Sequence, residues 1–393
     1  MASAPQPSTD LPARPTDTLR PRGALYAIDL LRFAAAMLVL LFHFFAGYSS
    51  PGHRLASRLI DQSLLPDVGR LYAGYGWIGV EIFFVISGYV IAISAHGSRA
   101  LPFARRRLLR LWPAALICAS LTLACLWPFD PRPSHFEEYA RSAMLWPWGE
   151  YIDGSYWTLG VESVFYALVA LLLWISPWRD RIEALALILG TASLFYWNGL
   201  GAELALDLRD AQLLLLPHGC FFALGIFLHR WHAGHRGWWR AAAMLLMIGT
   251  GVQEILFISR ATGIGMQIAY PRWIGPLIFF GGLAIIAFSP RLQPMLERHL
   301  PRAPVLLLGL ATYPLYLIHQ TIGLVLISAL LKAGLAYVPA ALITLVAITG
   351  AALLIASTAE PWLRALMSRL LPFSPPSRGP VPNRRQSASR RGG

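Results

Sequence analysis

Charged side chains are scarce in this sequence. Of its 393 residues, 13% are charged and 56% are hydrophobic, whereas soluble domains carry about 25% charged residues. So few charges cannot cover the surface of the two or three soluble domains that this length would otherwise suggest. An intrinsically disordered chain is excluded as well, because such chains combine low hydrophobicity with high net charge.

Cysteine is also scarce. The three cysteines, Cys118, Cys125 and Cys220, all lie within apolar segments, where cysteine behaves as a small hydrophobic residue. They form neither a disulfide framework nor a metal-binding pattern. We therefore expect no structural disulfide, no metal and no bound cofactor.

Long apolar segments make up most of the chain. A helix needs about 20 residues to cross about 30 Å of hydrocarbon. Ten segments approach that length: 24–48, 76–96, 111–128, 156–176, 182–199, 211–229, 240–258, 273–289, 304–331 and 337–358. The sequence thus predicts an all-α, polytopic integral membrane protein with about ten transmembrane helices.

The segments that flank this membrane region are polar. We expect a disordered Pro/Ser/Thr-rich leader over residues 1–23, a membrane domain over 24–364 and a disordered basic tail over 365–393. Both termini are predicted to be cytoplasmic. No hydrophilic stretch is long enough for a second folded domain.

The net charge of +13 would suggest a nucleic-acid partner in a soluble chain, but here it follows the predicted topology. With ten spans and a cytoplasmic N-terminus, the arginine clusters at 99–110, 230–240, 291–302 and 364–391 all fall on the inner side. Most acidic residues between the spans fall on the outer side. The expected surroundings are therefore a lipid bilayer, and no nucleic acid is expected as a partner.

The first span carries ionisable residues at membrane depth, where a charge costs about 3 kcal/mol or more and usually serves a function. Arg32 and His43 are eleven residues apart. On a helix that spacing leaves them about 20° apart around the axis and about 16 Å apart along it. One helix face would therefore present a cation near the inner surface and an imidazole nearer the outer surface.

The second and third spans add further candidates. Glu81 lies in the segment GVEIFFVISGYVI, at or near the outer end of the second span. Arg107 and Arg110 lie one helical turn apart before Pro113. Two arginines on one face can bind phosphate together, although such a cluster equally serves to fix the topology.

Two later spans combine aromatic and ionisable residues. Glu162 and Tyr166 share a face of the fourth span, where they suit a proton acceptor or a clamp for sugar hydroxyls. Tyr313, Tyr316 and His319 follow at three-residue spacing beside Pro314. They would line one side of a helix, either along a substrate pathway or as part of an aromatic belt at the membrane interface. These residue types fit general-base chemistry on an anionic cytoplasmic ligand. They equally fit a proton-coupled transporter.

The order of these motifs resembles the bacterial acyltransferase 3 family, ten-helix membrane proteins that O-acylate carbohydrates. The resemblance covers residues 24 to 364. It rests on IDLLRFAAAMLVLLFHF with Arg32 and His43, on GVEIFFVISGYVI with Glu81 in place of the usual Asp, on Arg107-x-x-Arg110 before Pro113, on WTLGVESVFY with Glu162 and Tyr166, on TYPLYLIH ending at His319, and on AEPWLRAL near the end. Ser163 stands where many members have a second Glu, so any role of that carboxylate is absent here.

The resemblance implies a reaction: transfer of an acyl group, most often acetyl, from cytoplasmic acyl-CoA to a hydroxyl of a cell-envelope or exported carbohydrate. It also implies a multi-pass protein of the bacterial inner membrane. Some members carry an added extracytoplasmic hydrolase-like domain, and we expect this chain to act alone or with a separate partner. The alternative that remains from the residues is a transporter of lipid-linked sugars, acyl groups or protons.

The resemblance also implies roles for single residues. His43 would be the catalytic residue, as general base or as transient acyl carrier, with Arg32 orienting it or contacting the donor. Arg107 and Arg110 would bind the phosphates of CoA. Glu162 is a further catalytic candidate, and Glu81, Tyr166, Tyr316 and His319 would complete the acceptor side.

Overall fold

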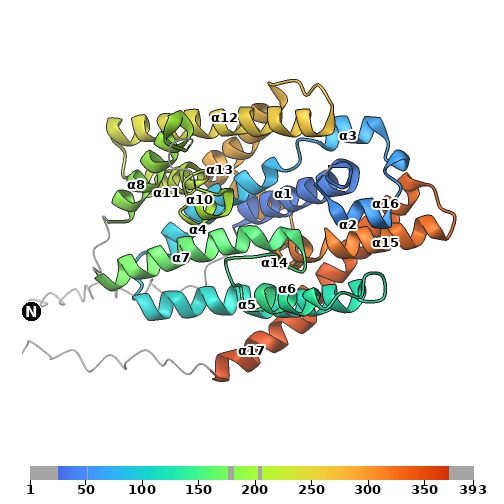
Figure 1. The fold of residues 1–393 in the computed structure, drawn as a ribbon. Coiled ribbons are helices and arrows are strands. Elements are labelled where there is room, and N and C mark those ends of the chain that lie inside the picture. Colours follow the sequence, from blue (N-terminus) through green and yellow to red (C-terminus); the bar gives the residue numbers. More distant parts are fainter. Residues whose placement is uncertain (1–24, 51, 176–180, 202–205, 371–393) are drawn as a thin grey trace, which may run out of the picture.

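The structure, a computed structural model, describes residues 25–50, 52–175, 181–201 and 206–370. Within these ranges the chain forms helices and their connections and no β-strand (Figure 1). The prediction of an all-α fold is therefore confirmed. The predicted leader lies outside the described residues, as does most of the predicted tail.

The longer helices form a bundle in which α12, α1, α7 and α5 run across the view of Figure 1. The helices are α1 (Tyr26–Phe45), α2 (Arg54–Leu59), α3 (Asp67–Ala73), α4 (Ile78–Ala95), α5 (Ala100–Leu126), α6 (Ser134–Ala143), α7 (Trp157–Ile175), α8 (Arg181–Phe195), α10 (Leu208–Leu213), α11 (Gly219–His232), α12 (Trp238–Met266), α13 (Ile274–His299), α14 (Arg302–Ile318), α15 (Thr321–Lys332), α16 (Tyr337–Leu354) and α17 (Glu360–Leu370). A π-helical turn, η4 (Tyr196–Leu200), follows α8, and another, η5 (Ile355–Ala359), joins α16 to α17.

Among the described residues, seven helical segments are long and apolar enough to cross a membrane, and α14 with α15 forms an eighth that is bent by 69°. The prediction of a polytopic membrane protein is confirmed, but the count of ten is not. The predicted segments 182–199 and 211–229 overlap α8 and α11, which have 15 and 14 residues. Both are shorter than the roughly 20 residues that a straight span requires.

Two helix boundaries differ from those expected. Helix α5 begins at Ala100, before the predicted segment 111–128, so Arg107 and Arg110 lie within a helix of 27 residues. Helix α17 continues to Leu370, into the segment expected to be a disordered tail. An ion pair between Glu360 and Arg364, one turn apart on α17, stabilises this continuation.

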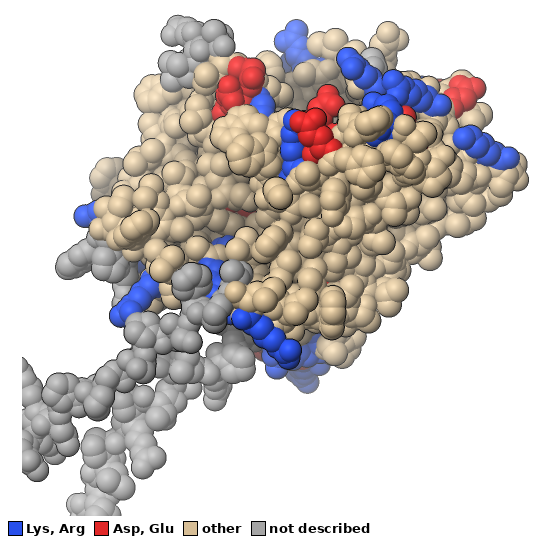
Figure 2. All heavy atoms as spheres, turned by 60° about the horizontal axis from the view of Figure 1, so that its bottom comes forward, with Lys and Arg blue, Asp and Glu red and all other residues tan. Residues whose placement is uncertain are grey.

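Charged residues are distributed as a membrane protein requires. In Figure 2 most of the visible Lys, Arg, Asp and Glu side chains lie toward two opposite ends, with a broad apolar band between them, and the visible acidic residues gather at one of those ends. Large apolar side chains such as Trp174, Leu245 and Val346 are exposed on this molecule. Exposed apolar area on this scale is stable against lipid and not against water.

Helix α4 lies in the core, and glycines allow its neighbours to approach. A Cβ atom at Gly88 would lie 2.1 Å from the carbonyl oxygen of Phe222 on α11, and one at Gly225 of α11 would lie 2.0 Å from that of Val85 on α4. A Cβ at Gly79 would meet the carbonyl of Ala35 on α1 at 2.4 Å. Only a hydrogen atom fits at these crossings, as is typical of closely packed membrane helices. The site described next is built on α1, α4 and the helices around them.

Candidate active site

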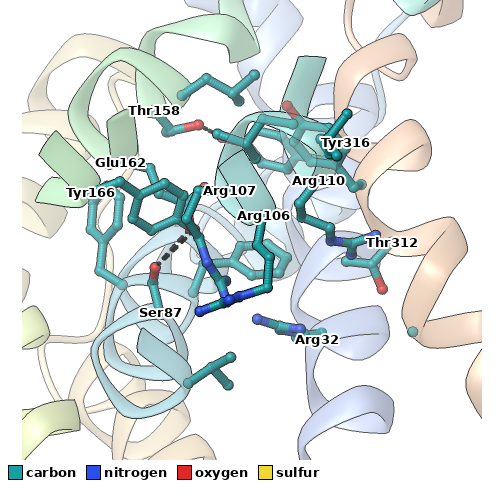
Figure 3. A pocket seen from close by; sticks show the side chains of 18 of the residues that line it. Arg32, Ser87, Arg106, Arg107, Arg110, Thr158, Glu162, Tyr166, Thr312 and Tyr316 are labelled. Carbon is teal, nitrogen blue, oxygen red and sulfur yellow. Dashed lines mark hydrogen bonds between the residues drawn. The ribbon is translucent and has the colours of Figure 1, made fainter. Parts of the chain in front are cut away.

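A cavity of about 540 Å³ opens among α1, α4, α5, α7, α14 and α17. Its basic residues are Arg32, Arg106, Arg107, Arg110 and Arg364, and we call it the arginine cavity. Figure 3 shows the side chains of Arg32, Arg106 and Arg107 converging on the same space. Lysine is absent from the described lining, and Glu162 is its sole carboxylate. The cavity therefore carries an excess of positive charge and suits a polyanionic ligand.

Arg364 of α17 reaches the Arg107-x-x-Arg110 motif of α5 at a carbonyl group that a proline in α5 leaves without a partner. Pro113 has no N–H to donate to the carbonyl oxygen of Leu109, four residues earlier in α5. Arg364 of α17 replaces that donor, with its Nε 3.1 Å from the Leu109 oxygen. Glu360 of α17 pairs with Arg364 and lies 3.6 Å from Nη1 of Arg110. Helix α17 therefore fixes the end of the Arg107-x-x-Arg110 motif.

A hydrogen-bonded group lies on the opposite wall of the cavity. Ser87 of α4 donates to Oε1 of Glu162 at 2.7 Å, and the hydroxyl of Tyr166 donates to the same oxygen (Figure 3). The guanidinium of Arg107 lies 5.7 Å from the centre of the Tyr166 ring, within the range of a cation–π contact. Glu162 accepts from both donors through one oxygen, and the carboxyl group has further lone pairs that can accept hydrogen bonds from a ligand.

The bend between α14 and α15 places His319. The two helices are separated by His319 and Gln320, and a break in a helix frees backbone groups that need new partners. Asp153 accepts from the backbone N–H of Thr321 at 2.8 Å, and the hydroxyl of Tyr48 donates to the carbonyl of Gln320 at 2.7 Å. Discontinuous helices of this kind form substrate sites in many membrane proteins.

The hydrogen bonds of His319 determine which of its nitrogens carries the proton. Its Nδ1 lies 2.8 Å from the backbone carbonyl oxygen of Tyr316. A carbonyl oxygen only accepts, so Nδ1 is the donor, and in the neutral ring Nε2 keeps its lone pair. That Nε2 is buried and has no hydrogen-bond partner among the described residues. It is available to accept a proton or a hydrogen bond.

His319 lies between the arginine cavity and His43. The ring centre of His319 is 5.6 Å from that of Tyr316, which lines the arginine cavity, and 5.0 Å from that of His43. His43 lines a second cavity of about 460 Å³, which we call the histidine cavity, with Gly47, His53 and Thr262 among its other residues. The rings of Tyr316, His319 and His43 thus form a continuous row from one cavity to the other.

His53, beyond the end of the first span, adds a further imidazole to the histidine cavity. Burial lowers the pKa of His53 below its ordinary value, because the charged ring is poorly solvated there. At neutral pH this ring is uncharged. The residue therefore adds polarity but no positive charge beside His43.

The structure divides the sequence-predicted site residues among three places. Five of them line the arginine cavity with Arg32: Arg107, Arg110, Glu162, Tyr166 and Tyr316. His43 and His319 lie together outside that cavity, beyond Tyr316, and His43 lines the histidine cavity. Glu81 lies apart from both, next to His218, which directly precedes α11, and Glu254 of α12. No motif predicted this last association, although both partners are ionisable residues in apolar segments, which is the signal that drew attention to Glu81.

The fold and the cavities define a polytopic helical membrane protein with a basic cavity that leads toward a pair of histidines. The family described as an acyltransferase domain matches residues 25–357. The chain belongs to this family, the acyltransferase 3 family that the ordered motifs resemble.

Individual relatives agree with this family. The chain is 26% identical over 296 residues to the O-acetyltransferase OatA of Staphylococcus aureus strains NCTC 8325 / PS 47, COL and MRSA252. The matched region is 63% of this chain and 46% of each relative, so the chain matches about half the length of these curated relatives. No solved structure matches the chain.

Proposed function

We propose that this protein is a membrane O-acyltransferase that transfers an acyl group, with acetyl as the first choice, from cytoplasmic acyl-CoA to a hydroxyl of a cell-envelope or exported carbohydrate. Membership of the acyltransferase family and the similarity to proteins named O-acetyltransferase support this proposal. Family membership also favours a transferase over the transporter that the residues alone would allow. The protein would lie in the inner membrane with the arginine cavity facing the cytoplasm.

The observation that carries the proposal is the row of rings between the two cavities. Five arginines line the arginine cavity, and two of them, Arg110 and Arg364, lie beside Glu360. A guanidinium group binds phosphate through paired hydrogen bonds. Arg107 and Arg110 would hold the phosphates of CoA, with Arg32 deeper along the same wall. The pantetheine arm would then extend past Tyr316 toward His319 and His43.

His43 would supply the base at the end of that path. Its imidazole takes the proton of the acceptor hydroxyl while the hydroxyl oxygen bonds to the thioester carbonyl carbon. The C–S bond then breaks, the acyl group stays on the acceptor oxygen, and the thiolate takes the proton from His43 to leave as CoA. Glu162, held by Ser87 and Tyr166, would accept hydrogen bonds from the donor or from the surrounding arginines.

The first experiment compares the surface and secreted glycans of a deletion strain complemented with the wild type or with His43→Ala. We expect mass spectrometry to find a base-labile increment with the mass of an acetyl group for the wild type and none for the variant, at equal membrane insertion. An increment of another mass would identify a different acyl donor. Glycans that carry the same increment in both strains would refute the role of His43.

The donor side is tested by Arg107→Ala in detergent-solubilised protein. Loss of charge-assisted hydrogen bonds worth about 1.5–3 kcal/mol raises the KM for acetyl-CoA about 10- to 100-fold. With S-acetylpantetheine, which lacks the nucleotide phosphates, the KM is expected to be the same for wild type and variant. The control is Arg302→Ala, an exposed arginine at the start of α14. An equal change with both donors would show that Arg107 does not bind the phosphates.

A further inference from the structure

A third cavity, of about 650 Å³, adjoins the site but takes no part in the mechanism above. It lies among α1, α4, α7, η4, α10, α12 and the segment that precedes α11, and four of its lining residues are Trp77, Trp157, Tyr196 and Trp197. We call it the tryptophan cavity. Flat aromatic rings can stack against the C–H faces of sugar rings.

The polar groups of this cavity come from two helices and the start of a third. Glu81 of α4, His218 directly before α11 and Glu254 of α12 are 2%, 4% and 0% exposed. Nδ1 of His218 lies 2.8 Å from Glu254 and 3.6 Å from Glu81. Oε2 of Glu254 and Nε2 of His218 are buried without a hydrogen-bond partner among the described residues. Buried polar atoms are rarely left unpaired, so these two atoms point to a ligand.

The charge of the cavity restricts that ligand. Its described lining contains two carboxylates, one imidazole and the amides of Gln212 and Gln253, and no arginine or lysine. Carboxylate oxygens accept hydrogen bonds from hydroxyl or ammonium groups and repel other anions. The arginine cavity, by contrast, is lined by five arginines. A uronic acid or a sugar phosphate would find no arginine or lysine in the described lining of the tryptophan cavity, whose one imidazole already lies against Glu254 and Glu81. A neutral or amino sugar would satisfy the carboxyl acceptors.

The tryptophan cavity borders the histidine cavity. Phe42 and Thr262 line both, and Phe42 directly precedes His43 in α1. A saccharide chain bound in the tryptophan cavity can therefore extend past Phe42 into the histidine cavity. Its next ring would present a hydroxyl to His43.

We propose that the tryptophan cavity is a saccharide-binding subsite that holds a neutral or amino-sugar ring of the acceptor next to the ring that is acylated. This inference rests on the proposed function in one respect, that the acceptor is a carbohydrate. Trp157 and Trp197 supply the stacking faces, and Glu81 and Glu254 accept hydrogen bonds from the sugar.

The experiment uses oligosaccharides cut from the exported polysaccharide of the source bacterium and de-O-acylated with mild base. Saturation-transfer NMR with the full-length protein in detergent reports which sugar protons touch it. We expect saturation of neutral or amino-sugar rings with the wild type, and at least a fivefold loss with Trp197→Ala. Trp197→Phe, which keeps an aromatic face, should recover most of the signal. Trp174→Ala, a change at a tryptophan that is 80% exposed at the end of α7, is the matched control.

Three results of the NMR experiment would contradict the proposed saccharide-binding subsite. The first is no saturation of any sugar proton with the wild type, and the second is saturation confined to uronic-acid rings. The third is an equal signal for Trp197→Ala and the control. A stoichiometric divalent metal that disappears in Glu254→Gln, with saccharide binding unchanged, would assign the Glu81–His218–Glu254 cluster to the metal instead.

Acyl transfer, measured separately, distinguishes the two proposals. If the wild type acylates its acceptor while Trp197→Ala binds and reacts equally well, the subsite fails and the proposed function stands. If saccharide binds but no acyl group is ever transferred, the proposed function fails and the subsite stands.

Discussion

At the scale of single residues, the hydrogen bonding of His319 fixes its tautomer and suggests a role beside His43. Its Nδ1 donates to the backbone of Tyr316, so its lone pair resides on Nε2, within the row of rings that includes His43. A second imidazole in this position can accept a hydrogen bond from His43 and select the tautomer of that residue. His319 would then position His43 and would not itself bind either substrate.

Two isosteric substitutions separate that role from simple packing. His319→Asn keeps a donor at the place of Nδ1 but loses the acceptor at Nε2, and we expect kcat to fall about 100-fold, as for loss of a proton-transfer partner. His319→Gln places its amide near Nε2 and is expected to recover part of that loss. The kcat–pH profile should shift with His319→Asn, since the basicity of His43 changes. Full activity of His319→Asn would mean that His319 serves only the packing of the bend.

At the scale of helices, α4 forms part of the wall of both the arginine cavity and the tryptophan cavity, and its close packing against α1 and α11 fixes its position. Ser87 lines the arginine cavity and Glu81 the tryptophan cavity, and α4 carries both. The helix contacts α11 through Gly88 and Gly225, and α1 through Gly79. Any side chain at these positions separates the helices and alters both cavities together.

Gly88→Ala tests this packing. A Cβ at 2.1 Å from the Phe222 carbonyl forces the two helices apart, at a cost of about 1–3 kcal/mol, as in other overpacked cores. We expect a lower midpoint of thermal unfolding in detergent and weaker acyl transfer. Gly249→Ala on α12, where a Cβ would meet nothing within 4 Å, is the matched control and should be neutral. Equal midpoints for the two variants would contradict a close contact between α4 and α11.

At the scale of the whole molecule, the arginine cavity and the histidine cavity lie toward opposite ends of α1, since Arg32 lies near the beginning of that helix and His43 near its end. The chain crosses the membrane between those ends. Donor and acceptor can then approach from opposite faces of the bilayer, provided that the arginine end faces the cytoplasm.

Single cysteines can report that orientation. Leu64, after α2, is 49% exposed, and Leu101, at the start of α5, is 64% exposed. In intact spheroplasts a membrane-impermeant maleimide is expected to label Leu64→Cys, whereas Leu101→Cys should react only after lysis, because arginine-rich segments stay on the cytoplasmic side. The native Cys118 and Cys220 are fully buried and Cys125 is partly exposed, so the wild type is labelled in parallel and its signal is subtracted as the background. The reverse pattern would place the arginine cavity outside.

Much of the fold was predictable from the sequence because its signals are local. Apolar segments and their arginine-rich borders predicted a polytopic helical membrane protein. The number of spans was not predictable in the same way. Hydropathy does not reveal that residues 304–331 bend by 69° between α14 and α15, or that α8 and α11 are too short for a straight span.

The sequence by itself determined the membrane class, the placing of Arg32 and His43 on one helix face, and the ordered motifs, since each depends on residues close together in the chain. Only the tertiary structure decided which distant residues meet. It placed His319 beside His43 through the break between α14 and α15, and Arg364 at the carbonyl that Pro113 leaves free. It also brought His218 and Glu254 to Glu81. These long-range contacts follow from packing between helices. Steric fit and the pairing of buried polar groups select them, and both depend on several segments at once.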